Sequence, residues 1–256
     1  MSKAKIVAIE AGTLFTPTKK LASARLIIEG NSIAEVGEAE SVRIPAGAEK
    51  VEASQFVVVP GFIDSHIHGC GGVDVMDGTY ESLNAVSHII ARHGTTAFLP
   101  TTVSSPTELL TTAIEKLGNL MTKTFDGARP IGIHLEGPFI NAARRGTHKA
   151  ANVIAPDAEL FGKWIRASGH SLRLVTIAPE LEGTERIIGM ARNSGITVAM
   201  GHSNATLFAS RSGHRWRSAL RRSGVCGDHR GRRSCRSRRR TPLCTSERKG
   251  ARPPGH

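Results

Sequence analysis

The sequence lacks any hydrophobic run that approaches the roughly 20 residues of a membrane-spanning helix. It also lacks the pattern of a secretory signal, because the basic residues among positions 1–5 are followed by only a short apolar run, which Glu10 interrupts. These two absences argue against an integral membrane protein and against an exported one. We therefore expect a protein with no membrane contact.

Cysteine is scarce as well. The chain has 4 cysteines in 256 residues, and Cys70 is the only one before residue 210. A single thiol cannot form a disulfide within that part of the chain, whereas exported proteins often depend on disulfides. This pattern predicts a reducing compartment, and we expect the protein to be cytoplasmic.

Acidic residues are nearly absent from the end of the chain. Residues 1–210 carry 19 Lys+Arg against 20 Asp+Glu, whereas residues 211–256 carry 15 against 2. The formal net charge of +12 therefore belongs to an Arg-rich tail and not to the whole protein. Such a tail could bind nucleic acid through its phosphates. We favour the other interpretation, in which residues 211–256 are out of frame or disordered, because the tail has little apolar periodicity.

Residues 1–59 have the pattern of a small β unit. Short apolar or alternating segments are bounded by turn signals, and Glu29-Gly30-Asn31 is typical of a tight turn between two strands. The predicted strands cover residues 6–9, 25–28, 32–36 and 56–59.

From residue 60 onward the pattern changes to strands that alternate with helices. Predicted strands end near His68, Pro100, Glu136, Pro179 and His202, and the segments between them have helical spacing. This alternation favours a parallel α/β sheet. About five strand-helix units are visible over residues 60–210, whereas a closed (β/α)8 barrel has eight.

Two of these helices have clear limits in the sequence. One is predicted to start at a capping box over residues 105–108, with Pro106 in the first turn. Another is predicted from Thr184 to Ser194, with Gly195 ending it. The apolar stripe predicted for the first helix consists of Leu109, Leu110, Ala113, Ile114 and Leu117.

Metal-ligand residue types follow several of the predicted strands. His66 and His68 are separated by one residue, so both imidazoles can point to the same side of a strand end. Glu136 is followed by Gly137-Pro138, which ends a strand where a ligand belongs. His134 faces the same side as Glu136, but we predict a packing or supporting role for it. His88, His93 and His170 fit solvent-exposed positions.

Four motifs together are specific to one family. They are Pro-Gly-Phe-Ile-Asp-x-His-x-His-Gly at residues 60–69, His-Leu-Glu-Gly-Pro-Phe at 134–139, Ala-Pro-Glu at 178–180 and Met-Gly-His-Ser-Asn-Ala at 200–205. Residues 4–210 thereby resemble the N-acetylglucosamine-6-phosphate deacetylase family of the amidohydrolase superfamily. A His-x-His pair alone would also admit dihydroorotases and hydantoinases. Relatives that bridge two metals, however, commonly use a carboxylated lysine where this family uses a glutamate at the end of the third barrel strand, which corresponds to Glu136.

The resemblance implies a fold and a set of site residues. The fold is a (β/α)8 TIM-type barrel, incomplete here, with a small N-terminal β-sandwich part. Glu136 and His202 would bind the main divalent metal, and His66 and His68 would bind a second one. Zinc or iron is expected, as one or two ions. His148, in the Arg-Gly-Thr-His cluster at 145–148, matches a family histidine that contacts the sugar.

The resemblance also implies a reaction, namely hydrolysis of N-acetylglucosamine 6-phosphate to glucosamine 6-phosphate and acetate in amino-sugar recycling. Intact family members are usually homodimers, and the expected partner is this small amino-sugar phosphate and not nucleic acid. A further metal-binding histidine and the catalytic aspartate that accepts a proton from water have no counterpart in this sequence. We therefore expect this chain to be inactive as it stands. The alternatives are another amidohydrolase specificity, as in dihydroorotases or hydantoinases, and an inert barrel fragment with a basic nucleic-acid-binding tail.

The charge break near residue 210 leads to a prediction about the gene. Translation of the DNA downstream of codon 210 should give, in another frame, a histidine followed within a few residues by Asn-Ala-Met, and then further strands with a late aspartate. If none of the frames encodes these elements, the tail is an evolved sequence and the out-of-frame interpretation is wrong.

Overall fold

The computed structural model describes residues 4–205 of the 256-residue chain. The predicted basic tail over residues 211–256, the end of the predicted barrel part at 206–210 and the nucleic-acid alternative all lie outside the described residues. Among the helices of residues 4–205, none is both long enough and apolar enough to cross a bilayer.

The N-terminal part forms a four-stranded sheet in the order β3-β2-β1-β4, which we call the N-terminal sheet. β1 pairs antiparallel with β2 and β2 antiparallel with β3, whereas β1 and β4 are parallel. The predicted tight turn joins β2 to β3, with Gly30 at a φ of 59° that glycine adopts at low cost. The four strands are β1 (Ile6–Phe15), β2 (Lys20–Glu29), β3 (Ser32–Glu38) and β4 (Glu49–Val58).

All four segments predicted as strands in this part are strands, so the small β unit is confirmed. Apolar side chains are buried in it, and Ala8, Ile27 and Val42 form one cluster. The domain limits at residues 59 and 210 stay predictions.

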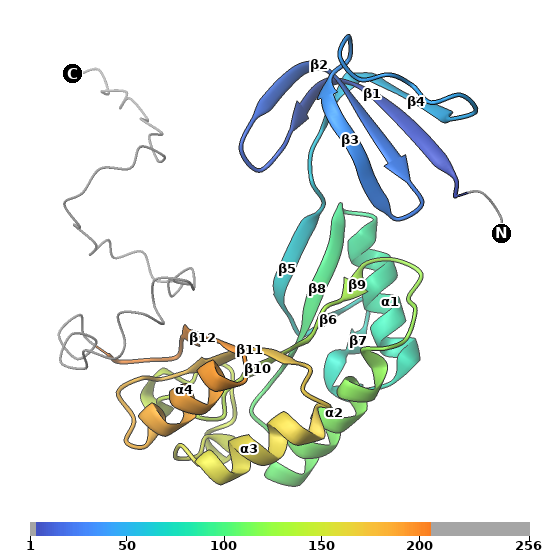
Figure 1. The fold of residues 1–256 in the computed structure, drawn as a ribbon. Coiled ribbons are helices and arrows are strands. Elements are labelled where there is room, and N and C mark those ends of the chain that lie inside the picture. The colour runs from blue at the N-terminus through green and yellow to red at the C-terminus, as the bar shows by residue number, and fades with distance from the viewer. Residues whose placement is uncertain (1–3, 206–256) are drawn as a thin grey trace, which may run out of the picture. The chain divides into compact units, whose positions relative to one another are not determined.

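The second part is built on parallel strands, which we call the barrel sheet. Its five main strands follow one another in chain order, β5-β8-β10-β11-β12, and neighbouring strands are parallel (Figure 1). They are β5 (Phe62–Ile67), β8 (Thr95–Thr102), β10 (Ile133–Glu136), β11 (Leu172–Ile177) and β12 (Thr197–Met200). This order, with helices in the connections, is that of an incomplete (β/α)8 barrel and confirms the predicted fold.

The connections between these strands hold the helices and some shorter elements. The helices are α1 (Tyr80–Ala91), α2 (Thr107–Leu120), α3 (Ala158–Ala167) and α4 (Thr184–Asn193). The short strands are β6 (Gly69–Cys70), β7 (Val73–Asp74) and β9 (Arg129–Pro130), and the 3-10 turns are η1 (Val75–Asp77), η2 (Ala142–Arg144) and η3 (Ala150–Asn152).

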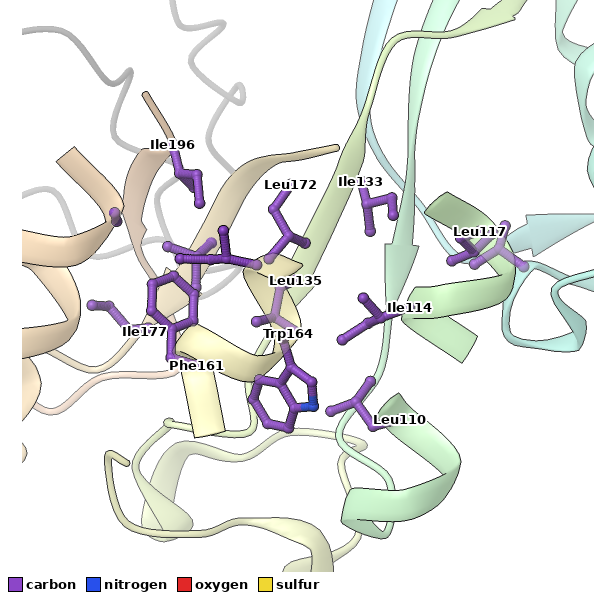
Figure 2. Close-up of a cluster of buried hydrophobic side chains, with 14 of the residues drawn as sticks. Leu110, Ile114, Leu117, Ile133, Leu135, Phe161, Trp164, Leu172, Ile177 and Ile196 are labelled. Carbon is purple, nitrogen blue, oxygen red and sulfur yellow. The ribbon is translucent and has the colours of Figure 1, made fainter. Parts of the chain in front are cut away.

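One apolar core joins the helices to one face of the barrel sheet (Figure 2). The helices contribute Leu110 and Ile114 from α2 and Trp164 from α3, which meet Ile133 and Leu135 of β10. The indole Nε1 of Trp164 donates a hydrogen bond of 2.9 Å to Thr111 Oγ1, so its polar group is satisfied within the packing. Because this core covers one face, polar side chains of the same strands collect on the other.

The start of α2 differs from its prediction. Pro106 is the N-cap residue and no side chain caps the helix. Ser105 lies one position too early, and its Oγ donates to the carbonyl of Val103 instead. The predicted capping box is therefore wrong. The prediction that Leu109 belongs to the apolar stripe is also wrong, because Leu109 is 63% exposed. The buried stripe includes Leu110 and the residues three, four and seven positions after it.

The predictions for the second helix and for three exposed histidines are confirmed. The helix predicted from Thr184 is α4, which ends at Asn193 with Ser194 as its C-cap. His88, His93 and His170 are all exposed, as predicted.

The exposed apolar side chains of β5 lead to a prediction about solubility. Within residues 4–205, β5 is an edge strand of the barrel sheet, and Ile63 on it is 66% exposed. Unpaired edges with exposed apolar groups promote association between chains. Ile63→Lys should therefore increase the soluble fraction after expression, measured by fractionation of lysates. Leu109→Lys is the matched control, since Leu109 is 63% exposed but lies on a helix. An equal gain in both variants would contradict the edge-strand explanation.

Candidate functional site

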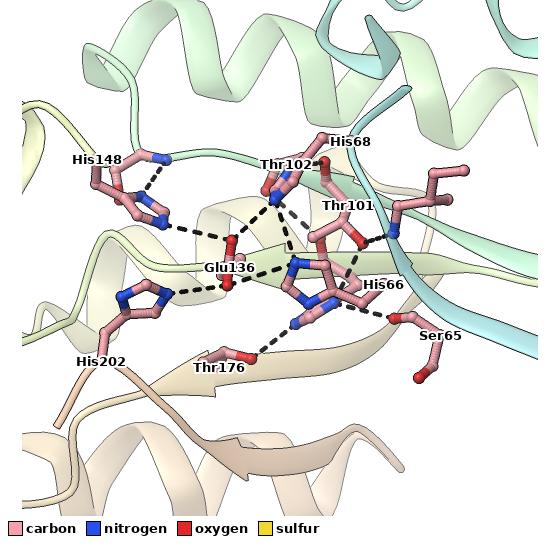
Figure 3. Close-up of polar contacts among 12 residues, drawn as sticks. Ser65, His66, His68, Thr101, Thr102, Glu136, His148, Thr176 and His202 are labelled. Atoms are coloured by element: carbon pink, nitrogen blue, oxygen red, sulfur yellow. Dashed lines mark hydrogen bonds and ion pairs between the residues drawn. The ribbon is translucent and has the colours of Figure 1, made fainter. Parts of the chain in front are cut away.

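A cluster of histidines surrounds one glutamate at the carboxyl ends of the barrel strands (Figure 3). His66 lies at the end of β5 and His68 directly after it, whereas Glu136 is the last residue of β10. His148 lies in the loop that follows β10, and His202 follows β12. Because parallel strands end at the same edge of a sheet, residues distant in sequence meet here.

Strand alternation explains why Glu136 faces this cluster. On β10, Ile133 and Leu135 belong to the apolar core, so the intervening His134 and Glu136 point to the other face. Glu136 is only 6% exposed there. The prediction that His134 and Glu136 share a face is confirmed.

The first group of possible metal ligands consists of His66, His68 and Glu136. Nε2 of His68 lies 3.1 Å from Glu136 Oε2, and Nε2 of His66 lies 3.6 Å from Glu136 Oε1. The two histidine Nε2 atoms are 3.2 Å apart.

The second group shares the same carboxylate and adds His148 and His202. Nε2 of His202 lies 3.0 Å from Glu136 Oε1, and Nε2 of His148 lies 3.4 Å from Glu136 Oε2. The structure thus brings together all five residues that the sequence selected for the site.

These distances fit a divalent cation. Ligand atoms about 2.0–2.1 Å from a zinc ion in tetrahedral geometry lie roughly 3.3 Å from one another. The separations of 3.0–3.6 Å around Glu136 match this value. Imidazole nitrogens with a carboxylate oxygen are also a donor set that zinc and iron accept.

Hydrogen bonds on the far side of each ring determine which nitrogen carries the proton. Nδ1 of His68 lies 3.0 Å from the carbonyl of Thr101, and Nδ1 of His202 lies 3.0 Å from the carbonyl of Arg144. A carbonyl only accepts, so Nδ1 donates in both rings, and Nε2 of the neutral ring presents a lone pair toward Glu136. Both rings therefore have the tautomer that binds a metal through Nε2.

His148 has the opposite arrangement. Its Nδ1 accepts from the backbone N–H of Ser104 at 3.2 Å and lies 2.8 Å from Ser104 Oγ. With Nδ1 accepting, the proton of the neutral ring is on Nε2, which donates toward Glu136 Oε2. His148 is thus a hydrogen-bond donor at the edge of the cluster, although its position alone would suggest a ligand.

The carboxylate dominates the electrostatics of the cluster. Burial opposes the charge of Glu136, but hydrogen bonds from His148, and from His202 and His68 when their rings are protonated, outweigh this effect and hold the pKa of Glu136 far below its usual value. The hydrogen bond to Glu136 in turn raises the pKa of His68 and of His202. Burial lowers the pKa of His66, despite the neighbouring Glu136. A positive charge is therefore favoured among these atoms, as protons or as a metal ion.

His134 lies beside the cluster and connects three strands. Its Nδ1 lies 3.1 Å from the carbonyl of Ser65 and 3.2 Å from Thr101 Oγ1, and its Nε2 lies 2.7 Å from Thr176 Oγ1. Burial lowers the pKa of His134 to about 4, so the ring is neutral at physiological pH. Both nitrogens are occupied by protein groups, which agrees with the predicted supporting role.

Some residues at the site were not found from the sequence. Thr101 orients His68 and Ser104 orients His148. Thr101 is the penultimate residue of β8 and Ser104 lies two residues after its end, a region that the sequence had marked only by Pro100. The side chain of Asp64 accepts a hydrogen bond of 3.0 Å from the backbone N–H of His66. It thus contacts the backbone of the strand end that carries the histidine pair.

Comparisons with known proteins agree with this site. The family model described as "Amidohydrolase family" matches residues 57–218. An N-acetylglucosamine-6-phosphate deacetylase from Lysinibacillus sphaericus is 36% identical over 160 residues, which cover 62% of this chain and 41% of that protein. An N-acetylgalactosamine-6-phosphate deacetylase from Escherichia coli O157:H7 is 32% identical over 168 residues, covering 66% of this chain and 45% of that protein.

A solved structure is similar as well. It is a mutant N-acetyl-D-glucosamine-6-phosphate deacetylase from Mycobacterium smegmatis in complex with N-acetyl-D-glucosamine-6-phosphate, with 31% identity and a TM-score of 0.71. The similarity covers 81% of this chain and 52% of that structure. The chain thus spans roughly half or less of the length of the relatives it matches. Since the family match over residues 57–218 extends over more than half of the sequence, the chain belongs to the amidohydrolase family.

Proposed function

We propose that this site serves the metal-dependent hydrolysis of N-acetylglucosamine 6-phosphate to glucosamine 6-phosphate and acetate. The observation that carries the proposal is the buried Glu136, whose carboxylate lies within 3.0–3.6 Å of Nε2 of four histidines in a member of the amidohydrolase family. The names of the relatives support the choice of substrate.

Amidohydrolases typically depend on divalent metals, and the two groups around Glu136 could hold one. We assign the main site to Glu136 and His202, with zinc or iron as the ion, and a second site to His66 and His68. The lone pairs of His68 and His202 at Nε2 support these roles. A bound ion would polarise the amide carbonyl and lower the pKa of a water molecule.

The protein side chains would orient the reaction. The carbonyls of Thr101 and Arg144 hold His68 and His202 with Nε2 toward Glu136. Ser104 holds His148 with Nε2–H directed toward Glu136 Oε2. With a metal ion bound to Glu136, this N–H would donate to a sugar oxygen of the substrate instead. This donor role agrees with the substrate contact that the resemblance implied for His148.

Of the groups that the reaction needs, the one that transfers a proton is the least well represented among residues 4–205. Amide hydrolysis needs a group that accepts a proton from water and delivers it to the leaving amine. Among the described residues, Glu136 is the only carboxylate of the two ligand groups, and the histidines already engage it. We therefore expect this chain to bind metal and substrate but not to turn the substrate over.

A second candidate substrate is N-acetylgalactosamine 6-phosphate, because a relative that acts on that sugar is 32% identical. A cyclic-amide specificity, as in dihydroorotases and hydantoinases, is less well supported, because the carboxylate at the centre of the cluster is Glu136 and not a modified lysine.

Compartment and assembly are also proposals. The free thiol of Cys70 supports a reducing compartment, for which we propose the cytoplasm. A homodimer, the usual state of intact family members, stays a prediction.

The ligand assignment predicts different effects for neighbouring substitutions on β10. Glu136→Gln should weaken metal binding by at least about 100-fold, because it removes a ligand, whereas loss of a supporting group costs roughly 10–100-fold or less. His134→Gln should have the smaller effect, because both its ring nitrogens contact protein groups. Elemental analysis after dialysis against defined metal buffers measures the difference. Full metal content in Glu136→Gln would refute the ligand role.

The proposed function is tested by substrate binding to the metal-loaded chain. Calorimetry should detect binding of N-acetylglucosamine 6-phosphate but not of hydantoin or dihydroorotate. His148→Ala should weaken that binding by about 1 kcal/mol, roughly fivefold in Kd, because one hydrogen bond is lost. An acetate assay should show no turnover above the protein-free background. Binding of a cyclic amide in place of the amino-sugar phosphate would contradict the proposal, and acetate release at ordinary enzymatic rates would contradict the expected inactivity.

A further inference from the structure

The backbone of His202 has a left-handed conformation. Its φ is 49°, in the left-handed region that residues with a side chain seldom adopt. Such a conformation persists only where surrounding contacts enforce it. The conformation matters because the Nε2 of His202 faces Glu136 across 3.0 Å.

Glu180 makes contacts directly beside this strained residue. Its Oε2 accepts a hydrogen bond of 2.6 Å from Ser203 Oγ, and its Oε1 accepts one of 2.6 Å from the backbone N–H of Asn204. Oε1 also accepts from Asn141 Nδ2 at 2.9 Å. One carboxylate thus holds the two residues that follow His202 and connects them to the loop after β10.

The loop after β10 holds His202 from its other side. The backbone N–H of Asn141 donates to the carbonyl of His202 at 2.9 Å. The carbonyl of Arg144 accepts from His202 Nδ1 at 3.0 Å, and Nε of Arg144 donates to Asn204 Oδ1 at 2.6 Å. Glu180 and this loop therefore contact the backbone of the segment, its side chains and the His202 ring.

We propose that Glu180 is a positioning residue, which fixes the segment 202–204 so that Nε2 of His202 is presented to a metal ion shared with Glu136. The proposal rests on the metal site of the proposed function. Glu180 itself does not belong to either group of possible ligands. It acts through Ser203, Asn204 and Asn141, which it contacts directly.

The contacts suit a carboxylate better than an amide. Three donors approach its two oxygens, and a glutamine would present a donating NH2 group to at least one of them. Within residues 4–205, no ion pair involves Glu180, so neutral donors hold its charge. Burial raises the pKa of Glu180, but the hydrogen bonds from Ser203, Asn204 and Asn141 outweigh this effect and keep the pKa below its usual value.

The test compares Glu180→Gln with Glu182→Gln in the full 256-residue chain. Glu182 is exposed and its side chain makes no hydrogen bond or ion pair with residues 4–205, so its substitution removes the same charge without the contacts. Cobalt(II) is the probe, because its visible absorption reports the ligand geometry. We expect Glu180→Gln to weaken cobalt binding about tenfold, as loss of a group that supports a ligand does, and to change the spectrum. Glu182→Gln should match the unsubstituted chain in both respects.

Ser203→Ala is the second variant, and it keeps the proposal testable if Glu180→Gln misfolds. It removes one donor to Glu180 and leaves the carboxylate in place, so it should weaken cobalt binding in the same direction but less. If Glu180→Gln does not fold, as judged by circular dichroism, the result for Ser203→Ala decides. If Glu180→Gln folds and its cobalt affinity and spectrum are unchanged, the positioning role is wrong. If Glu180→Gln does not fold, an unchanged affinity and spectrum in Ser203→Ala would overturn the role instead.

Glu136→Gln separates this proposal from the proposed function. If Glu136→Gln weakens cobalt binding and Glu180→Gln does not, the metal site holds and only the positioning role is wrong. If cobalt binding is unaffected by Glu136→Gln, the metal site of the proposed function fails, and the role of Glu180 fails with it.

Discussion

The buried carboxylate of Glu136 is the group on which the arrangement of the site depends. An ionised carboxylate that is only 6% exposed is costly unless donors or cations surround it. Nε2 atoms of four histidines from two strand ends and one loop approach it within 3.6 Å (Figure 3). The parallel order of the barrel sheet makes this possible, because it brings the ends of β5, β10 and β12 to one edge. The fold and the charge of the site are therefore linked through one residue.

The two faces of the barrel sheet have different roles, one in folding and the other in the chemistry of the site. The face under the helices buries large apolar side chains, which stabilise the sheet mainly by removing apolar surface from water. The opposite face carries His134, Thr101 and Thr176, which connect neighbouring strands by hydrogen bonds. Among the described residues, no buried side-chain nitrogen or oxygen lacks a partner. A fully satisfied polar network of this kind holds the histidines in place.

The sequence predicted the parts of this protein that depend on local pattern. Apolar runs indicated the strands. His66, His68, Glu136 and His202 were selected as polar residues at the ends of these strands, because a strand end fixes both the position and the side of a residue. The contacts that orient these residues were not predictable in the same way. Thr101 and Arg144 act through backbone carbonyls, which every residue has, so no residue type reveals them. The capping box at α2 failed by one position, which is within the usual uncertainty of helix ends.

The histidines around Glu136 also connect metal binding to protonation. Glu136 raises the pKa of His68 and His202, so without a metal these rings hold protons to a higher pH than an isolated histidine. A metal ion needs the same Nε2 lone pairs, and it must therefore displace those protons. As the pH falls through the raised pKa values, protons compete more strongly and the ion is held less tightly. The same carboxylate that attracts the cation thus also sets the pH below which protons replace it.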